Sequence, residues 1–237
     1  MLDEALLWDT SDSPFCLKAR ICLQLKAVPY RRVTVTLARR RELRRLNPLG
    51  KVPVLVDGGE VVVDSSAIAR HLEARHPEPP LLPADPAARA FCALVEDWAD
   101  EALYFLVGGF KWLNAANRAA ALENTLAEVE AGLLRPVVAH RLVRRVARRY
   151  RAWGYGPDHL AELVERMRDA LATMNALLEG KAFLLGRTPT LADVAVFVQL
   201  NWMQRYAEGR LIDEVPGVRA WLGRLEAVPA IADALST

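Results

Sequence analysis

The segment from residue 47 to residue 69 constrains the fold of this chain more than any other. Its Val-Pro pair opens a short valine-rich run, and Asp57-Gly58-Gly59 separates this run from a second one. A proline cannot donate a hydrogen bond to a neighbouring strand, so Pro53 belongs at a strand's first residue or edge, and its peptide bond is a candidate for the cis form. The Gly-Gly pair supplies the positive φ angles of a tight turn. The segment therefore predicts a β-hairpin.

The second run leads directly into Asp64-Ser65-Ser66, which has the composition of a helix start. Free backbone N–H groups and small polar side chains at such a start attract a carboxylate or a phosphate. A strand edge that Pro53 holds open would lie beside this helix end. The pair predicts a cradle for a small anionic peptide; the alternative is an ordinary hairpin followed by a capped helix.

The rest of the first third predicts alternating strands and helices. Residues 5–8 and 30–35 read as strands, because the first is an apolar run and the second is rich in β-branched residues. Residues 14–28 and the very basic residues 39–46 read as helices, and a further helix extends from residue 65 to about residue 75. The predicted order is β-α-β-α-β-β-α.

A proline-rich stretch, residues 76–86, is the clearest domain boundary. Beyond it the pattern is helical. We expect one long helix over 86–117 with a bend at Gly108-Gly109, a second over 117–153 interrupted near residues 132 and 136, and further helices over 158–179, around 191–198 and over 216–235. The sequence predicts an α/β domain at 1–77, a linker at 78–86 and an all-helical domain at 87–237.

This plan, and the hairpin segment in particular, resembles the glutathione S-transferase superfamily, whose first domain is thioredoxin-like. In that family the residue before a cis-proline pairs with the cysteinyl part of glutathione, and an acidic residue followed by Ser holds the γ-glutamyl end. The resemblance implies that Val52, Pro53, Asp64 and Ser65 bind glutathione, although the family often has Glu at the position of Asp64. It implies that Lys51 meets the glycyl carboxylate; otherwise Lys51 is a solvated turn residue.

Ser13-Pro14-Phe15-Cys16 follows the first strand at a helix start, where a hydroxyl hydrogen could donate to a thiolate and lower the thiol pKa. The motif resembles the Ser-type active sites of theta- and zeta-like transferases, which implies that Ser13 stabilises the glutathione thiolate. It also resembles the Cys-Pro-Phe-Cys motif of glutaredoxins, but Ser13 cannot form a mixed disulfide. Ser11 and, less well, Thr10 are alternative donors, and a plain helix cap is the other interpretation of Ser13.

Cys16 lies one helical turn further on. It is either a packed helix residue or a secondary thiol that takes glutathione in a weak disulfide reductase. Exchange of Cys16 for Ser distinguishes the two, because it should abolish reductase activity and spare conjugation.

The first helix of the second domain carries the aromatic residues Tyr104, Phe105 and Trp112. In the resembled family this helix lines the pocket of the hydrophobic co-substrate, and aromatic walls suit a flat apolar electrophile. Packing between helices or across a dimer interface is the alternative for each residue. Further along, Thr190-Leu191-Ala192-Asp193 matches a capping box, which predicts a folding role for Asp193.

Basic residues gather in two stretches. Residues 16–51 hold eleven Lys and Arg against one acid, Glu42, which would concentrate an anionic cofactor. Residues 135–151 hold seven Arg and no acid. We interpret the second stretch as the solvated face of an amphipathic helix; a surface for nucleic acid or anionic membrane, or an entry for acidic substrates, is the alternative.

The totals describe an ordinary globular chain of 237 residues with a net charge of +2, too small to imply nucleic acid. Three cysteines argue for a reducing compartment, and we find neither a secretory signal nor a membrane span, so we expect a cytoplasmic protein. The four histidines lack metal-ligand spacing, so no metal is expected.

We therefore expect a homodimeric glutathione transferase of the detoxification type that activates the glutathione thiol against a small hydrophobic electrophile. A zeta-like isomerase ranks lower, because Pro14 and Phe15 replace the tripeptide Ser-Ser-Cys of that class. The rivals are a non-catalytic interaction module with this fold and a glutathione-dependent thiol-disulfide oxidoreductase that uses Cys16.

Overall fold

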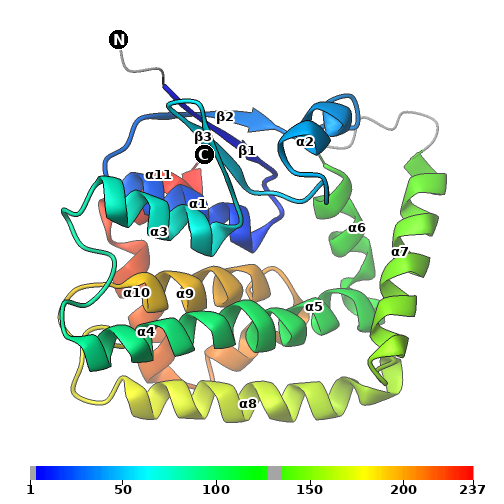
Figure 1. The fold of residues 1–237 in the computed structure, drawn as a ribbon. Helices are drawn as coiled ribbons and strands as arrows, with labels where there is room; N and C mark the ends of the chain where they lie inside the picture. Colours follow the sequence, from blue (N-terminus) through cyan, green and yellow to red (C-terminus); the bar gives the residue numbers. More distant parts are fainter. Residues whose placement is uncertain (1–3, 128–134, 237) are drawn as a thin grey trace.

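The computed structural model describes residues 4–127 and 135–236. A four-stranded sheet lies at one end of the molecule, and helices stacked beneath it make up the rest (Figure 1). Helices α1 (Pro14–Leu25) and α3 (Ser65–Arg75) lie between the sheet and the helical region, whereas α2 (Arg40–Leu46) lies near the opposite face.

The strands are β1 (Ala5–Asp9), β2 (Tyr30–Thr34), β3 (Val54–Asp57) and β4 (Glu60–Val63), in the spatial order β2-β1-β3-β4. β1 runs parallel to β2, and β3 is antiparallel to both β1 and β4. The predicted hairpin turn is present, because Gly58 and Gly59 have φ angles of 59° and 85°. The element order β-α-β-α-β-β-α and the α/β-then-helical plan are confirmed.

Both faces of the sheet are covered, as expected when the central strand lacks polar alternation. On one face Leu7 and Leu55 join a large core that continues through α1 into the helical region. On the other face Trp8, Val33 and Leu43 form a smaller cluster with α2. Helix α1 is central, because it packs against α3, α9 (Leu191–Met203) and α11 (Pro229–Ser236).

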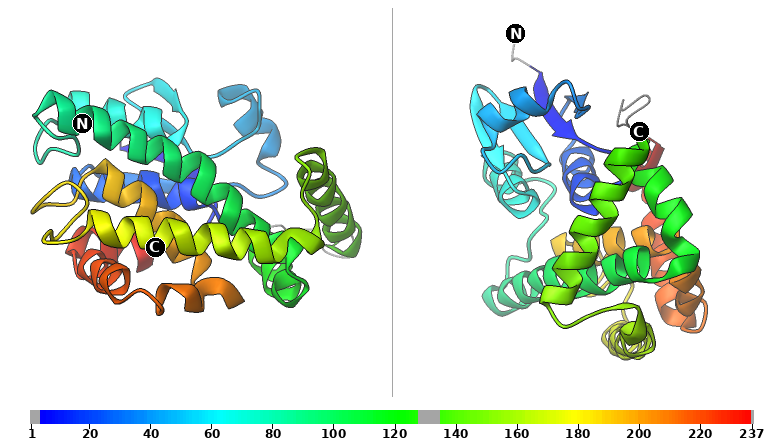
Figure 2. Two further views of the ribbon diagram at one scale, coloured as in Figure 1. Left: turned by 90° about the horizontal axis from the view of Figure 1, so that it is seen from below. Right: turned by 90° about the vertical axis from the view of Figure 1, so that its right-hand side faces the viewer.

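The helical region comprises, besides α9 and α11, the elements α4 (Pro86–Trp98), η1 (Ala99–Leu103), α5 (Tyr104–Leu113), η2 (Ala115–Asn117), α6 (Arg118–Leu126), α7 (Arg135–Ala152), η4 (Pro157–His159), α8 (Leu160–Leu177), η5 (Ala207–Ile212) and α10 (Pro216–Glu226). α9 contacts α1, α4 and α5 and lies at the centre of this arrangement (Figure 2). None of the helices in the described part of the chain is long and apolar enough to cross a membrane.

The predicted single helix over 86–117 is wrong in two respects. It ends at Leu113, because Asn114 adopts extended backbone angles and caps the short η2 helix with its own side chain. Its irregular turn is the π-helix η1, not the glycine pair. Gly108 and Gly109 instead allow close packing, since a Cβ on them would lie 2.5 Å from the Tyr150 hydroxyl and 2.7 Å from Leu163.

The predicted interruption near residue 132 lies outside the described residues. Pro136 stands in the first turn of α7, where its missing N–H is tolerated. The predicted breaks before α8 and α9, and the two short terminal helices, are present with bounds shifted by a few residues.

The predicted capping box at the start of α9 is present, and Asp193 makes further hydrogen bonds outside it. The carboxylate of Asp193 is fully buried and accepts from the backbone and hydroxyl of Thr190, both at 2.9 Å. It also accepts from the Leu184 backbone N–H at 2.8 Å and from the Trp221 indole at 3.0 Å. One side chain therefore ties α9 to α10 and to the loop before α9.

We predict that Asp193→Ala lowers the free energy of unfolding by about 3–5 kcal/mol, because it leaves three buried N–H donors without an acceptor. Denaturant unfolding followed by circular dichroism measures the change. The matched control is Asp213→Ala, which removes an exposed ion pair with Arg219 and should cost at most about 1 kcal/mol. Equal losses in the two variants would contradict this account of Asp193.

Candidate functional site

The register of the sheet brings the predicted site residues to one end. Val54 is paired with Trp8 on one side and with Val63 on the other. The residue before Val54 is Pro53, so it stands level with the end of β1 and with the start of α3. Three segments therefore meet at the same sheet edge. They are the loop that carries Ser13, the Val52-Pro53 pair and Asp64-Ser65.

The Val52-Pro53 peptide bond is cis, as the sequence suggested, and Pro53 is buried. The loop before it is braced by Asn47, which is 3 % exposed and donates to the Lys51 carbonyl at 2.9 Å. Asn47 also accepts from the Leu49 N–H at 3.1 Å. Sequence reasoning missed this residue, although Asn before Pro is a common turn signal. Lys51 itself is exposed beside the half-buried Val52.

The start of α3 combines a strained backbone with an unpaired hydroxyl. Asp64 has a φ of 86°, a region that non-glycine residues seldom occupy, and its carboxylate caps the N–H groups of Ser66 and Ala67 at 2.9 and 3.1 Å. Ser65 is 1 % exposed, and its hydroxyl has no hydrogen-bond partner among the described residues. Buried polar groups are nearly always paired, so this hydroxyl fits a position that a ligand completes.

A buried charge cluster supports this helix start from behind. Lys18 on α1 is fully buried and lies 2.7 Å from Glu96 and 2.5 Å from Asp100, and it donates to the Ser66 hydroxyl at 3.0 Å. Ser66 also donates to Glu96. Burial alone lowers the pKa of Lys18, but the two carboxylates outweigh it and the pKa is raised, so the ammonium stays charged. The cluster fixes α3 against α1 and α4.

Ser13 is the N-cap of α1, and its half-buried hydroxyl oxygen accepts from the Cys16 N–H at 3.3 Å. This bond uses an oxygen lone pair and leaves the hydroxyl hydrogen available to a further acceptor. The rival, Ser11, is exposed and accepts from Arg32 at 3.4 Å, outside the helix start. Ser13 therefore combines access with the positive field of the helix N-terminus.

Cys16 points inward. Its side chain is fully buried, and this burial, with a contribution from Asp9, raises the pKa of the thiol to about 12. A thiol of this kind is almost entirely protonated at neutral pH and is a poor nucleophile. The geometry favours the packing role among the two alternatives left open by the sequence.

Asp12, directly before Ser13, anchors this loop to the helical region. Its carboxylate lies 2.5 Å from the ammonium of Lys111 on α5 and accepts from the Thr125 hydroxyl at 2.7 Å and the Trp202 indole at 3.4 Å. Lys111 is 3 % exposed, and burial lowers its pKa against the opposing effect of Asp12. Sequence reasoning missed this pair, whose members are 99 residues apart.

The three predicted pocket aromatics do not share one position. Tyr104 lies next to the Ser13 loop, because its ring contacts Phe15 at 4.8 Å and stacks on Trp202 at 5.6 Å. Phe105 packs instead among Tyr150, Trp153 and Tyr155, at the C-terminal end of α7 and just after it. Trp112 lies near the loop anchor, with its ring 5.1 Å from the Lys111 ammonium.

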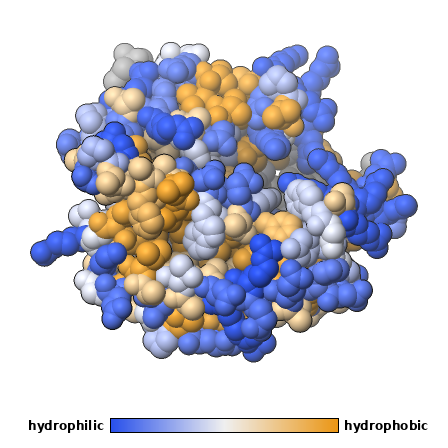
Figure 3. Space-filling view, turned by 60° about the horizontal axis from the view of Figure 1, so that its bottom comes forward, coloured by the Kyte–Doolittle hydropathy of each residue, from blue (hydrophilic) through white to orange (hydrophobic). Residues whose placement is uncertain are grey.

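The arginine-rich stretch forms most of α7, with Tyr150 as its buried contact. Its arginines are exposed, and the edge of the molecule where α7 lies is strongly hydrophilic (Figure 3). The Arg149 guanidinium covers the Trp153 ring at 4.6 Å. Within residues 4–127 and 135–236, no group of His, Cys, Asp or Glu has the arrangement of a metal site.

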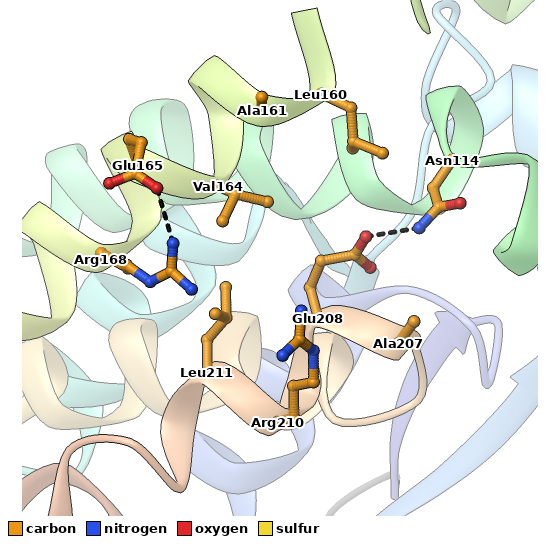
Figure 4. A pocket seen from close by; sticks show the side chains of 10 residues that line it. All are labelled: Asn114, Leu160, Ala161, Val164, Glu165, Arg168, Ala207, Glu208, Arg210 and Leu211. Atoms are coloured by element: carbon orange, nitrogen blue, oxygen red, sulfur yellow. Dashed lines mark hydrogen bonds and ion pairs between the residues drawn. The ribbon is translucent and has the colours of Figure 1, made fainter.

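A pocket of about 480 Å³ lies elsewhere, between α8 and η5 (Figure 4). Its walls include Leu160, Val164 and Leu211, and it contains none of the predicted site residues. Glu208 in its floor accepts from Asn114 at 2.6 Å and from Asn117 at 2.7 Å. These bonds join η5 to the end of α5 and account for the buried carboxylate structurally.

Comparison with known proteins agrees with this arrangement. Residues 7–80 match the family model described as glutathione S-transferase, N-terminal domain, and residues 157–224 match glutathione S-transferase, C-terminal domain. Protein LigF of Sphingobium sp. is 30 % identical over 80 % of this chain and 75 % of its own length. Maleylacetoacetate isomerase of Pseudomonas aeruginosa is 29 % identical over 92 % of this chain and 89 % of its own length.

The solved structures agree as well. The crystal structure of the beta-etherase LigF from Sphingobium has a TM-score of 0.75 and 25 % identity, and the match covers 98 % of each chain. Both halves of the fold, the element order and these relatives lead to one assignment. The chain belongs to the glutathione S-transferase family.

Proposed function

We propose that this protein is a glutathione transferase in which Ser13 stabilises the glutathione thiolate for attack on a hydrophobic electrophile. The observation that carries the proposal is the buried, unpaired Ser65 hydroxyl at the helix start of α3, level with the cis Val52-Pro53 pair. An anionic peptide that pairs with the Val52 backbone would bring its terminal carboxylate to Ser65. Such a ligand would complete a polar site that the protein alone leaves open.

The geometry supports a role for each residue of the proposed site. The Ser65 hydroxyl and N–H suit the α-carboxylate of the γ-glutamyl group, and the exposed Asp64 carboxylate suits its ammonium. Lys51, exposed beside Val52, suits the glycyl carboxylate. The thiol then lies toward Ser13, whose free hydroxyl hydrogen donates to the sulfur anion and favours the ionised thiol.

The reaction needs no covalent enzyme intermediate. The thiol proton leaves to solvent, and the thiolate electron pair forms a carbon–sulfur bond with the electrophile. In a displacement the bond from that carbon to the leaving group breaks, and the leaving group departs with its electrons. LigF is named a beta-etherase, and displacement of an ether oxygen is one reaction of this type that the arrangement supports. Tyr104 and Trp202 stack on each other beside the Ser13 loop, and aromatic residues in this place suit an aromatic electrophile.

Two alternatives have less support. A thiol-disulfide oxidoreductase would need Cys16 as an accessible thiolate, and its burial and raised pKa oppose this. A non-catalytic module would not require an open, unpaired Ser65 hydroxyl.

The division into domains at residues 78–86 stays a prediction, with glutathione on the first domain and the co-substrate on the second.

The Ser65→Ala variant tests the binding site. We expect calorimetric titration to show glutathione binding to the wild type and binding about 10- to 100-fold weaker in the variant, because a hydrogen bond to a carboxylate is lost. Ser236→Ala, at the exposed end of the last helix, is the control and should bind as the wild type does. No binding to the wild type at millimolar glutathione would overturn the proposed function.

The Ser13→Ala variant tests the thiolate role. We expect kcat/KM with a generic electrophile to fall about 10- to 100-fold at neutral pH, while glutathione affinity changes little. Ser11→Ala is the matched control, since the same change is made two residues away on the same loop. A large loss in Ser11→Ala with normal activity in Ser13→Ala would assign the role to Ser11 instead.

We also propose a homodimer. Helix α4 exposes Phe91 and Leu94, which are 38 % and 69 % exposed and lie three residues apart on one face. Apolar side chains grouped in this way favour burial against a partner. We predict a mass near twice that of the 26.3 kDa chain by light scattering. A monomer at micromolar concentration would contradict the proposal.

A further inference from the structure

The contact between Asp12 and Lys111 bears on how readily the bound thiol ionises. This inference rests on the proposed function. Asp12 is the residue directly before Ser13, so its carboxylate lies within one residue of the group that would stabilise the sulfur anion. A negative charge near a developing thiolate opposes its formation. The side chain of Asp12 is only 13 % exposed, so water screens this charge poorly.

Lys111 is placed to remove that penalty. Its ammonium lies 2.5 Å from Asp12 Oδ2 and is buried at 3 % side-chain exposure, in contact with the rings of Trp112 and Trp202 at 5.1 and 4.9 Å. The aromatic faces attract the cation and hold it at the carboxylate. Thr125 and Trp202 bind the remaining acceptor positions of Asp12, so the anchor draws on α5, α6 and α9.

We propose that Lys111 is a positioning residue for the thiolate, which neutralises Asp12 and holds the Ser13 loop against the helical region. With the ammonium present, Asp12 can anchor the loop without raising the pKa of the bound thiol. Without it, an uncompensated carboxylate would remain one residue from Ser13. Repulsion from this carboxylate would raise the pKa of the bound thiol, by roughly one pH unit.

The other charged groups near this loop are the same in all variants of the test. Arg205 approaches Asp12 Oδ1 at 3.8 Å, but its side chain is 41 % exposed, so it replaces Lys111 only weakly. Asp12, Arg149 and Glu101 act on Tyr104, whose pKa burial raises, so the phenol stays neutral. Asp9, Arg20 and Arg32 form a separate group behind the loop.

The experiment compares the pH dependence of the bound thiolate in wild type, Lys111→Met, Asp12→Asn and the double variant. Ultraviolet absorption of the glutathione thiolate gives its pKa, and kcat/KM against pH gives an independent value. We expect Lys111→Met to raise the midpoint by roughly one pH unit. Asp12→Asn leaves the Lys111 ammonium without its carboxylate, so its positive charge should lower the midpoint. The double variant carries neither charge and should stay near the wild-type midpoint. Lys111→Arg should also show the wild-type midpoint.

If the Asp12–Lys111 pair only ties the loop to the helical region, the variants should show a different pattern of kcat and midpoint. Both single variants would then lower kcat without moving the midpoint, and the double variant would not recover; this result would overturn the proposal. Lys26→Met is the matched control, since Lys26 is also a buried lysine, 2.5 Å from Glu73, at the far end of α1. A midpoint shift in Lys26→Met equal to that in Lys111→Met would also overturn it.

The outcomes distinguish a failure of the Lys111 role from a failure of the proposed function. If the wild type shows no thiolate signal with saturating glutathione, the proposed function fails and the role of Lys111 fails with it. If the wild type shows the signal and Lys111→Met leaves the midpoint unchanged, only the role of Lys111 is overturned. Should Lys111→Met fold poorly, Asp12→Asn still decides, because a midpoint unchanged from that of the wild type in this variant would overturn the role of Lys111.

Discussion

The antiparallel pairing of β3 with both β1 and β4 is the constraint on which the site depends. It sets Pro53 level with the end of β1 and the start of α3, so three segments distant in sequence meet at one edge. A slip of one residue would turn the side chains of β3 to the opposite face and misplace this edge. The Asn47 bonds and the Gly58-Gly59 turn fix β3 at its two ends.

Buried lysines also hold the helices and the Ser13 loop in place. Lys18 meets Glu96 and Asp100, Lys26 meets Glu73, and Lys111 meets Asp12. Each pair joins segments far apart in the chain. Buried ion pairs contribute little net stability compared with well-packed apolar residues, but they are strict about geometry, since a lost partner leaves a buried charge. The α/β part and the helical region are therefore held in one relative position, with the candidate site at their junction.

Local chemistry made much of this predictable from sequence. Pro53, the Gly-Gly turn, the Asp64 cap and the Thr190–Asp193 box each act over a few residues, and all are present. Contacts such as Asp12–Lys111 depend on how helices pack and carry no local pattern. One signal was nevertheless available: the chain has five lysines among 31 basic residues, and three of the five are buried. In a chain rich in arginine, a lysine indicates a position that suits a compact ammonium.

The helix bounds show the same division. The π-helix at 99–103 and the early end of α5 arise from packing and from the Asn114 cap, and sequence periodicity indicated neither. Gly108 and Gly109 predicted a bend but serve close approach of Tyr150 and Leu163. Burial likewise favours a packing role for Cys16, whose sequence position alone left a redox role open.

A crystal structure of the protein with glutathione bound would test the proposed site without relying on kinetics. We expect the γ-glutamyl carboxylate on Ser65, the cysteinyl backbone on Val52 and the sulfur within hydrogen-bond distance of the Ser13 hydroxyl. Glutathione bound elsewhere, for instance in the pocket beside Glu208, or a sulfur atom directed away from Ser13, would contradict the proposed site.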